Sequence, residues 1–204
     1  MSQTFQRKNL QEINNKSTRE NNKITKEKTV KYKKKKTKTQ KRITKQKGES
    51  MNSIYPELIA VDVQAETSEE AIRKVGQIFL DNGFVKDTYI DAVVAREKVY
   101  PTGLQLADMG VAMPHTDPPH VYKSGVCVAK LAKPVTFMHM GTEDQPVEAE
   151  MLFMMAITDP SQHLETLSKV MNVFQKPEIA KEFKDATTNE ELYKVAYKHI
   201  GLED

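Results

Sequence analysis

The chain has 204 residues, of which 38% are hydrophobic and 29% are charged. Its net charge of +3 hides an asymmetry, because residues 1–50 hold 17 basic and 4 acidic side chains and the remainder holds 14 basic and 24 acidic ones. The length allows one ordinary domain with a tail, and the single cysteine excludes an internal disulfide. No run of about eighteen apolar residues and no apolar segment behind the basic start is present, so we expect a cytoplasmic protein.

Residues 1–52 form a basic tail with almost nothing to bury, so the composition predicts disorder. Two interpretations of this tail are open. It is either an arm for nucleic acid or another anionic surface, or a segment outside the natural product, with Met51 as the true start. The second interpretation rests on Lys47-Gly48-Glu49-Ser50, which can be encoded as a purine-rich, ribosome-binding-like stretch. The folded domain is expected over residues 53–204.

The first part of this domain has the pattern of a strand followed by two helices. Leu58–Val63 predicts a strand. Thr67, with Glu70 three residues later, predicts a helix start with a capping box, and Asn82-Gly83 predicts the end of that helix. A second helix is expected from about Asp87.

A short apolar run, Val111–Met113, stops at Pro114 and is followed by His115. Proline cannot donate to a sheet ladder, so the strand is expected to end there. His115 should therefore lie at the mouth of a strand, at the start of a Pro-rich loop.

The last part of the chain alternates strands and helices. Gly125–Ala129 and Pro134–Met138 each predict a strand, and the continuous apolar run Met151–Ile157 predicts a central strand that is covered on both faces. Three helices should follow, beginning near Ser161, at Pro177 and after Thr188. The fold class expected is α/β, a layered sandwich with a mixed, largely central β-sheet flanked by helices on both faces.

Three motifs in order carry a family resemblance: Arg96-Glu97-Lys98, the turn Pro101-Thr102-Gly103-Leu104, and GVAMPHTDPPHV from Gly110 to Val121. Together they resemble the IIA component of a sugar phosphotransferase system, the type-2 domain of the mannitol/fructose class, over roughly residues 56–199. Thr116 and Asp108 stand where the mannitol and fructose pattern has a small residue and a glycine. This departure favours the galactitol-like branch.

The resemblance implies a phosphoryl carrier and two partners. His115 would accept phosphoryl from the general carrier protein HPr, and the family suggests Nε2 as the acceptor atom. The phosphoryl group would pass to a cysteine of a IIB component, which serves a membrane IIC component that imports galactitol or a related sugar or polyol. No cofactor is implied.

The chemistry of His115 agrees with that role. Histidine has a reference pKa of about 6.5, so near pH 7 its ring is mostly neutral and nucleophilic. Its nitrogen can take a phosphoryl group and release it to a second nucleophile. On spacing alone, a turn histidine without a function is the favoured interpretation, because a lone histidine is a weak signal.

His163 and Arg96 are the other two candidate catalytic residues. His163 matches the family's second histidine and lies in the first turn of a predicted helix, where unpaired N–H groups favour an anion. Arg96 could make a two-point contact with phosphate. The alternatives are a surface histidine and a helix-end arginine that pairs with Glu97.

No other residue forms a clear chemical site. His120, with Asp117 between it and His115, is a weak metal pattern in a loop of two prolines, so no metal is expected. Cys127 lies in an apolar strand and is expected in the core. No Gly-x4-Gly-Lys loop occurs, which argues against direct use of ATP.

A rival interpretation is a IIA-like regulatory module that binds nucleic acid through its basic arm. The absence of a helix-turn-helix pattern after Met51 counts against it.

Overall fold

The computed structural model describes residues 53–106, 108–142 and 144–201, apart from the side chains of residues 160–165. Five strands form one sheet in the order β1-β4-β5-β3-β2. In that order they are Ile54–Val63, Gly125–Met138, Pro146–Ala156, Gly110–Ala112 and Gly103–Gln105. The pairs β1–β4 and β3–β5 are parallel, whereas β4–β5 and β2–β3 are antiparallel. The sheet is therefore mixed, as expected. The basic tail predicted for residues 1–52 lies outside the described residues.

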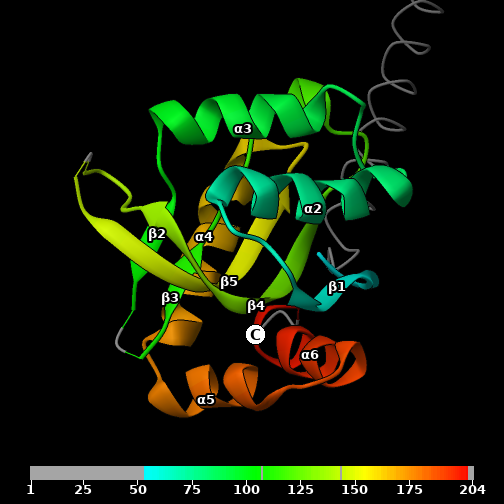
Figure 1. Cartoon of the computed structure of the whole chain (residues 1–204). Coiled ribbons are helices and arrows are strands. Elements are labelled where there is room, and N and C mark those ends of the chain that lie inside the picture. The colour runs from blue at the N-terminus through cyan, green and yellow to red at the C-terminus, as the bar shows by residue number, and fades with distance from the viewer. Residues whose placement is uncertain (1–52, 107, 143, 202–204) are drawn as a thin grey trace, which may run out of the picture. The chain divides into compact units, whose positions relative to one another are not determined.

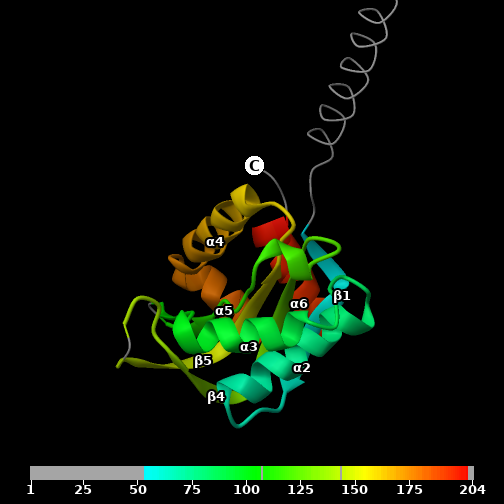
Figure 2. The same ribbon diagram turned by 90° about the horizontal axis from the view of Figure 1, so that it is seen from above.

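Helices cover both faces of the sheet (Figures 1 and 2). On one face lie α2 (Ser68–Asp81) and α3 (Tyr89–Val99); on the other lie α4 (Pro160–Phe174), α5 (Pro177–Asp185) and α6 (Asn189–Ala196). A short 3₁₀ turn, Pro118–His120, and a terminal π-helical turn, Tyr197–Gly201, complete the described elements. The α/β sandwich expected from the sequence is confirmed. Within the described ranges, no helix is long and apolar enough to cross a membrane.

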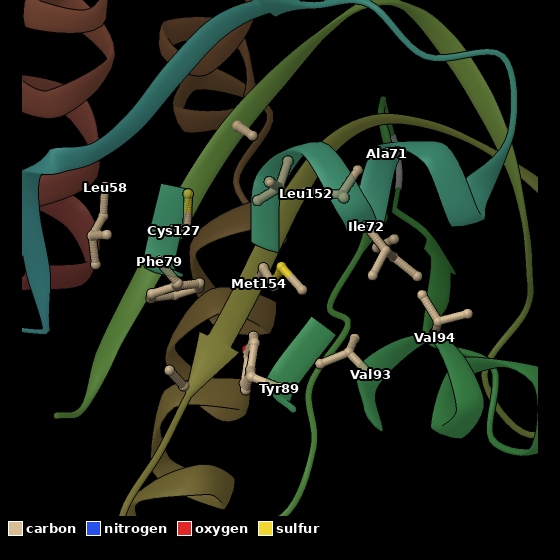
Figure 3. Packing of buried hydrophobic residues seen from close by; sticks show 14 of the residues in the cluster. Leu58, Ala71, Ile72, Phe79, Tyr89, Val93, Val94, Cys127, Leu152 and Met154 are labelled. Carbon is tan, nitrogen blue, oxygen red and sulfur yellow. The ribbon is translucent and has the colours of Figure 1, made fainter. Parts of the chain in front are cut away.

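Strand β5 divides the core into two halves. Because neighbouring side chains of a strand point to opposite faces, Leu152 and Met154 pack with α2 and α3, whereas Phe153 and Met155 pack with α4 to α6. Figure 3 shows the first half, in which Leu152 and Met154 lie among side chains of α2 and α3. All four side chains are fully buried. This confirms the prediction of a central strand covered on both faces.

The helix starts follow the predicted caps, with one difference. At α2, the hydroxyl of Thr67 accepts from the amide of Glu70 at 3.2 Å, but the carboxylate of Glu70 accepts from Glu66, one residue before the cap. At α6, Thr188 and Glu191 form the full reciprocal box. Both arrangements satisfy amides that a helix start leaves without partners.

One prediction about the strands was wrong. Gly125–Ala129 and Pro134–Met138 belong to one strand, β4, whose pairing with β5 is irregular between Lys130 and Val135. Pro134 is tolerated because it lies within that irregularity and beyond Leu131, the last residue of β4 paired with β1. Strand β2, only three residues long, was not predicted at all.

Candidate active site

His115 lies three residues after the end of strand β3, beside the end of β5. It forms an isolated parallel bridge with Met155, and the amide of Met155 donates to the carbonyl of Pro114 at 3.0 Å. Its side chain is largely buried, with 9% of the residue surface exposed. The β3 ladder itself ends at Ala112, so the proline separates the regular strand from the histidine.

The imidazole of His115 has a defined orientation. Its Nδ1 atom lies 2.9 Å from the carbonyl oxygen of Met113. A carbonyl can only accept, so Nδ1 carries the hydrogen of this bond. In the neutral ring, the basic lone pair then resides on Nε2.

Helix α3 supplies three hydrogen bonds next to this segment, one of them buried and two part-buried. At its first residue, the buried hydroxyl of Tyr89 donates to the carbonyl of Met155 at 2.7 Å. In its last turn, the carboxylate of Glu97 accepts from the amide and the hydroxyl of Thr102, at 2.9 and 2.8 Å. Burial raises the pKa of Glu97, and the two bonds from Thr102 act in the opposite direction.

Sequence reasoning missed these contacts. In the sequence, Tyr89 is one more apolar position of a helix, and Glu97 is a possible partner for Arg96. The sole signal for Glu97 is its place inside the Arg-Glu-Lys motif before the turn. The bond to Thr102 depends on how the chain turns back into β2, which the sequence did not reveal.

Arg96 lies in the last turn of α3 and is partly buried. Its guanidinium carbon lies 5.3 Å from the centre of the Tyr100 ring, within the range of a cation–π contact. After Tyr100 the chain enters β2, which pairs with β3 and so runs beside the segment that leads to His115.

His163 falls in the first turn of α4, the helix that follows β5. Its side chain is outside the described residues. The backbone connects the positions of the two histidines through the end of β5. His115 pairs with Met155, and α4, which contains His163, begins at Pro160, five residues after Met155.

The loop after His115 is tied to the segment before α3. The Nδ1 atom of His120 lies 2.9 Å from the hydroxyl of Thr88, and the His120 carbonyl accepts from the amide of Lys86.

Among the residues that the structure describes, no group of three or more His, Cys, Asp or Glu side chains is arranged to hold a metal ion.

Cys127 is fully buried in β4, in the core half shown in Figure 3. Burial raises the pKa of its thiol, because the thiolate would lose its hydration there. This agrees with the expected core role.

Comparisons with known proteins agree with this arrangement. A galactitol-specific EIIA component of the phosphotransferase system from Escherichia coli (strain K12) is 28% identical over 110 residues, covering 54% of this chain and 73% of that protein. A mannitol-specific phosphotransferase enzyme IIA component from Geobacillus stearothermophilus is 31% identical over 149 residues, covering 72% of this chain and 96% of that protein. The galactitol-specific relative supports the galactitol-like resemblance, and neither relative favours the nucleic-acid-binding rival.

Among solved structures, the complex of enzyme IIAMTL and phosphorylated enzyme IIBMTL from Escherichia coli contains a similar chain. It is 25% identical, with a TM-score of 0.58, and the match covers 70% of this chain and 95% of that one. Residues 52–199 match the family described as "Phosphoenolpyruvate-dependent sugar phosphotransferase system, EIIA 2". The chain therefore belongs to this family of phosphotransferase components, which act through a phosphohistidine.

Proposed function

We propose that His115 is the phosphoryl carrier of this domain, and that it acts in the cytoplasm between HPr and a IIB component. The observation that carries the proposal is the bond from Nδ1 of His115 to the Met113 carbonyl, which leaves the lone pair on Nε2. A ring held in this way presents one nucleophilic nitrogen. Because the ring is already oriented, it loses little conformational entropy when it reaches the reactive geometry.

The forward step is a transfer between two imidazoles. The Nε2 lone pair attacks the phosphorus of the donor phosphohistidine, the new N–P bond forms, and the old N–P bond returns its electron pair to the donor ring. The ring of His115 then carries positive charge as long as Nδ1 keeps its hydrogen. The Met113 carbonyl stabilises that charge by accepting the hydrogen bond.

The second step passes the group to a cysteine of the IIB component. The thiolate attacks phosphorus, the bond from Nε2 breaks, and its electron pair returns to the ring. The cationic ring is a better leaving group than a neutral one. The relative solved together with phosphorylated enzyme IIB supports a partner of this kind.

Arg96 and His163 are assigned supporting roles. Phosphoryl transfer spreads negative charge over three oxygens, so catalysis depends mainly on positioning and cationic groups. Arg96 brings a permanent positive charge at the end of α3. His163, in the first turn of α4, combines a ring N–H with the amides of a helix start.

The test is label transfer from phosphorylated HPr. The full chain should acquire acid-labile, base-stable label, and His115→Ala should acquire none. Arg96→Ala and His163→Ala should take up label roughly a hundredfold more slowly, the lower end of the effect of losing one catalytic group. His120→Ala is the control and should label normally, since His120 bonds Thr88. Undiminished label in His115→Ala would overturn the assignment.

We also propose that the transported compound is galactitol or a related polyol, entering through a membrane IIC component. The support is the similarity to galactitol-specific EIIA. The phosphorylated domain should transfer label faster to a galactitol IIB than to a mannitol IIB. Faster transfer to the mannitol protein would contradict this choice of sugar.

A further inference from the structure

The carboxylate of Glu97 is hydrogen-bonded to Thr102 through both of its oxygens. One oxygen accepts from the amide of Thr102 and the other from its hydroxyl, and Thr102 is only 2% exposed. Two bonds to one residue fix both the distance and the direction between the end of α3 and the start of β2. Glu97 therefore fastens the turn between them.

Thr102 in turn holds the segment next to the imidazole. Its carbonyl accepts from the amide of Met113 at 3.3 Å, and the next residue, Gly103, pairs with Ala112. On the far side, the carbonyl of Pro114 accepts from Met155 at 3.0 Å. The peptide group that carries the Met113 carbonyl thus lies between two peptide groups that are both hydrogen-bonded.

We propose that Glu97 and Thr102 are positioning residues that select the ring tautomer of His115. They do so by fixing the Met113 carbonyl, which accepts from Nδ1. The inference rests on the proposed function of His115, because the selected tautomer places the lone pair on Nε2, and Nε2 is the nucleophile of that function.

The effect expected is a change in tautomer populations. If the turn is released, the Met113 carbonyl is no longer fixed, and the Nδ1–H tautomer loses up to the preference supplied by one net hydrogen bond, about fivefold. Only this tautomer places the lone pair on Nε2. The initial rate of label uptake should therefore fall by about the same factor as the tautomer population.

The experiment compares Glu97→Ala with Glu97→Gln in the full chain. The ¹⁵N chemical shifts of the imidazole nitrogens report the tautomer, and the His115 signals are those missing from His115→Ala. A glutamine can accept from the Thr102 amide and donate to its hydroxyl, so it preserves both bonds without charge. We expect Glu97→Ala to shift the tautomer and Glu97→Gln to restore it.

A matched control exists at the other end of β5. There Glu148 accepts from the hydroxyl of Thr136 at 2.7 Å. Glu148→Ala removes a single, exposed Thr–Glu hydrogen bond and should leave the His115 shifts and the label uptake unchanged. If Glu97→Ala does not fold, Thr102→Ala, which keeps the amide bond and loses only the hydroxyl, should show a smaller shift in the same direction.

The outcomes separate this inference from the proposed function. Unshifted ¹⁵N signals in Glu97→Ala, or in Thr102→Ala where the first variant does not fold, would overturn the inference even if the protein takes up label. Slow uptake in Glu97→Gln with a normal tautomer would also overturn it, because Glu97 would then act through its charge. A tautomer shift in a protein that takes up no label would support the positioning role and reject the phosphoryl-carrier role.

Discussion

The side chain of Tyr89 makes the most sharply testable contact at the residue scale. Its hydroxyl is fully buried and donates to the Met155 carbonyl. Tyr89→Phe leaves that carbonyl without this donor in a dry environment, which should lower the free energy of unfolding by about 1–2 kcal/mol in urea titrations. Tyr100→Phe, at a residue with 63% of its surface exposed, is the control and should change stability little. Equal effects of the two variants would contradict this account.

Cys127 should be unreactive toward thiol reagents in the folded protein. Its thiol is buried and its pKa is raised by burial, so the reactive thiolate is scarce and inaccessible. A coloured thiol reagent should modify Cys127 in the native chain only as fast as the fold opens. Once urea unfolds the chain, the reaction should be rapid. Immediate stoichiometric reaction without denaturant would show that the strand is more open than described.

The position of His115 was predictable from sequence, whereas the neighbours that hold it were not. Pro114 is a local signal, because a missing N–H ends a ladder whatever the rest of the chain does. The contact between Glu97 and Thr102 spans a turn whose geometry depends on β2 pairing with β3. Such a bond is decided by tertiary structure, and no spacing rule for helices or strands contains it.

At the scale of elements, the pairing of β3 with β5 depends on Gly110. A Cβ atom built there would lie 2.0 Å from the carbonyl oxygen of Glu148, which is backbone and cannot move aside easily. Gly110→Ala should therefore cost about 3 kcal/mol of unfolding free energy.

The matched variant for this prediction is Gly141→Ala. Gly141 has a φ of +81° but open space around it, so the strain of a left-handed residue alone should cost about 1 kcal/mol. Urea titrations of both variants provide the comparison. A Gly110→Ala protein as stable as Gly141→Ala would mean that β3 can shift away from β5.

Local signals predicted some elements and failed for others. The apolar run of β5 and the Thr188 cap of α6 lie within a few residues, so the sequence contains their whole explanation. Strand β2 has three residues and exists because β3 lies beside it. The continuity of β4 through Pro134 likewise depends on where β1 stops pairing. These features arise from non-local pairing, which a single sequence read in windows does not contain.

The whole molecule should lose stability in acid. Hydrogen bonds with cations lower the pKa of several carboxyls, among them Glu69, bonded to Lys98 and Arg73, and Glu182, bonded to His199 and Lys198. A folded-state pKa below the unfolded value means that the native state binds fewer protons, so this stability is present above about pH 4.3 and is lost as pH falls through the folded pKa. Protonation also leaves 14 Lys and Arg and five His of residues 51–204 without balancing charge. The thermal midpoint should fall between about pH 5 and pH 3, and a constant midpoint would contradict this expectation.

Two variants test the sign of this effect. Glu97 has a raised folded-state pKa, so its contribution is complete below the unfolded pKa and is lost as pH rises through the folded one. Removing it with Glu97→Gln should make the loss of stability in acid steeper. Glu182→Gln removes a lowered pKa and should make the loss shallower. Thermal midpoints across the same pH series measure both slopes, and the reverse order would refute the assignment.

The burial of Cys127 has a consequence for the proposed route of the phosphoryl group. Sulfur is the expected acceptor on the IIB partner, so an accessible thiol on the carrier would compete for its own cargo. Cys127 lies beneath α2 and α3 within the fully packed half of the core. If His115 carries the group as proposed, Cys127 is therefore not an acceptor within the folded domain, and the thiol that takes the group has to come from a partner.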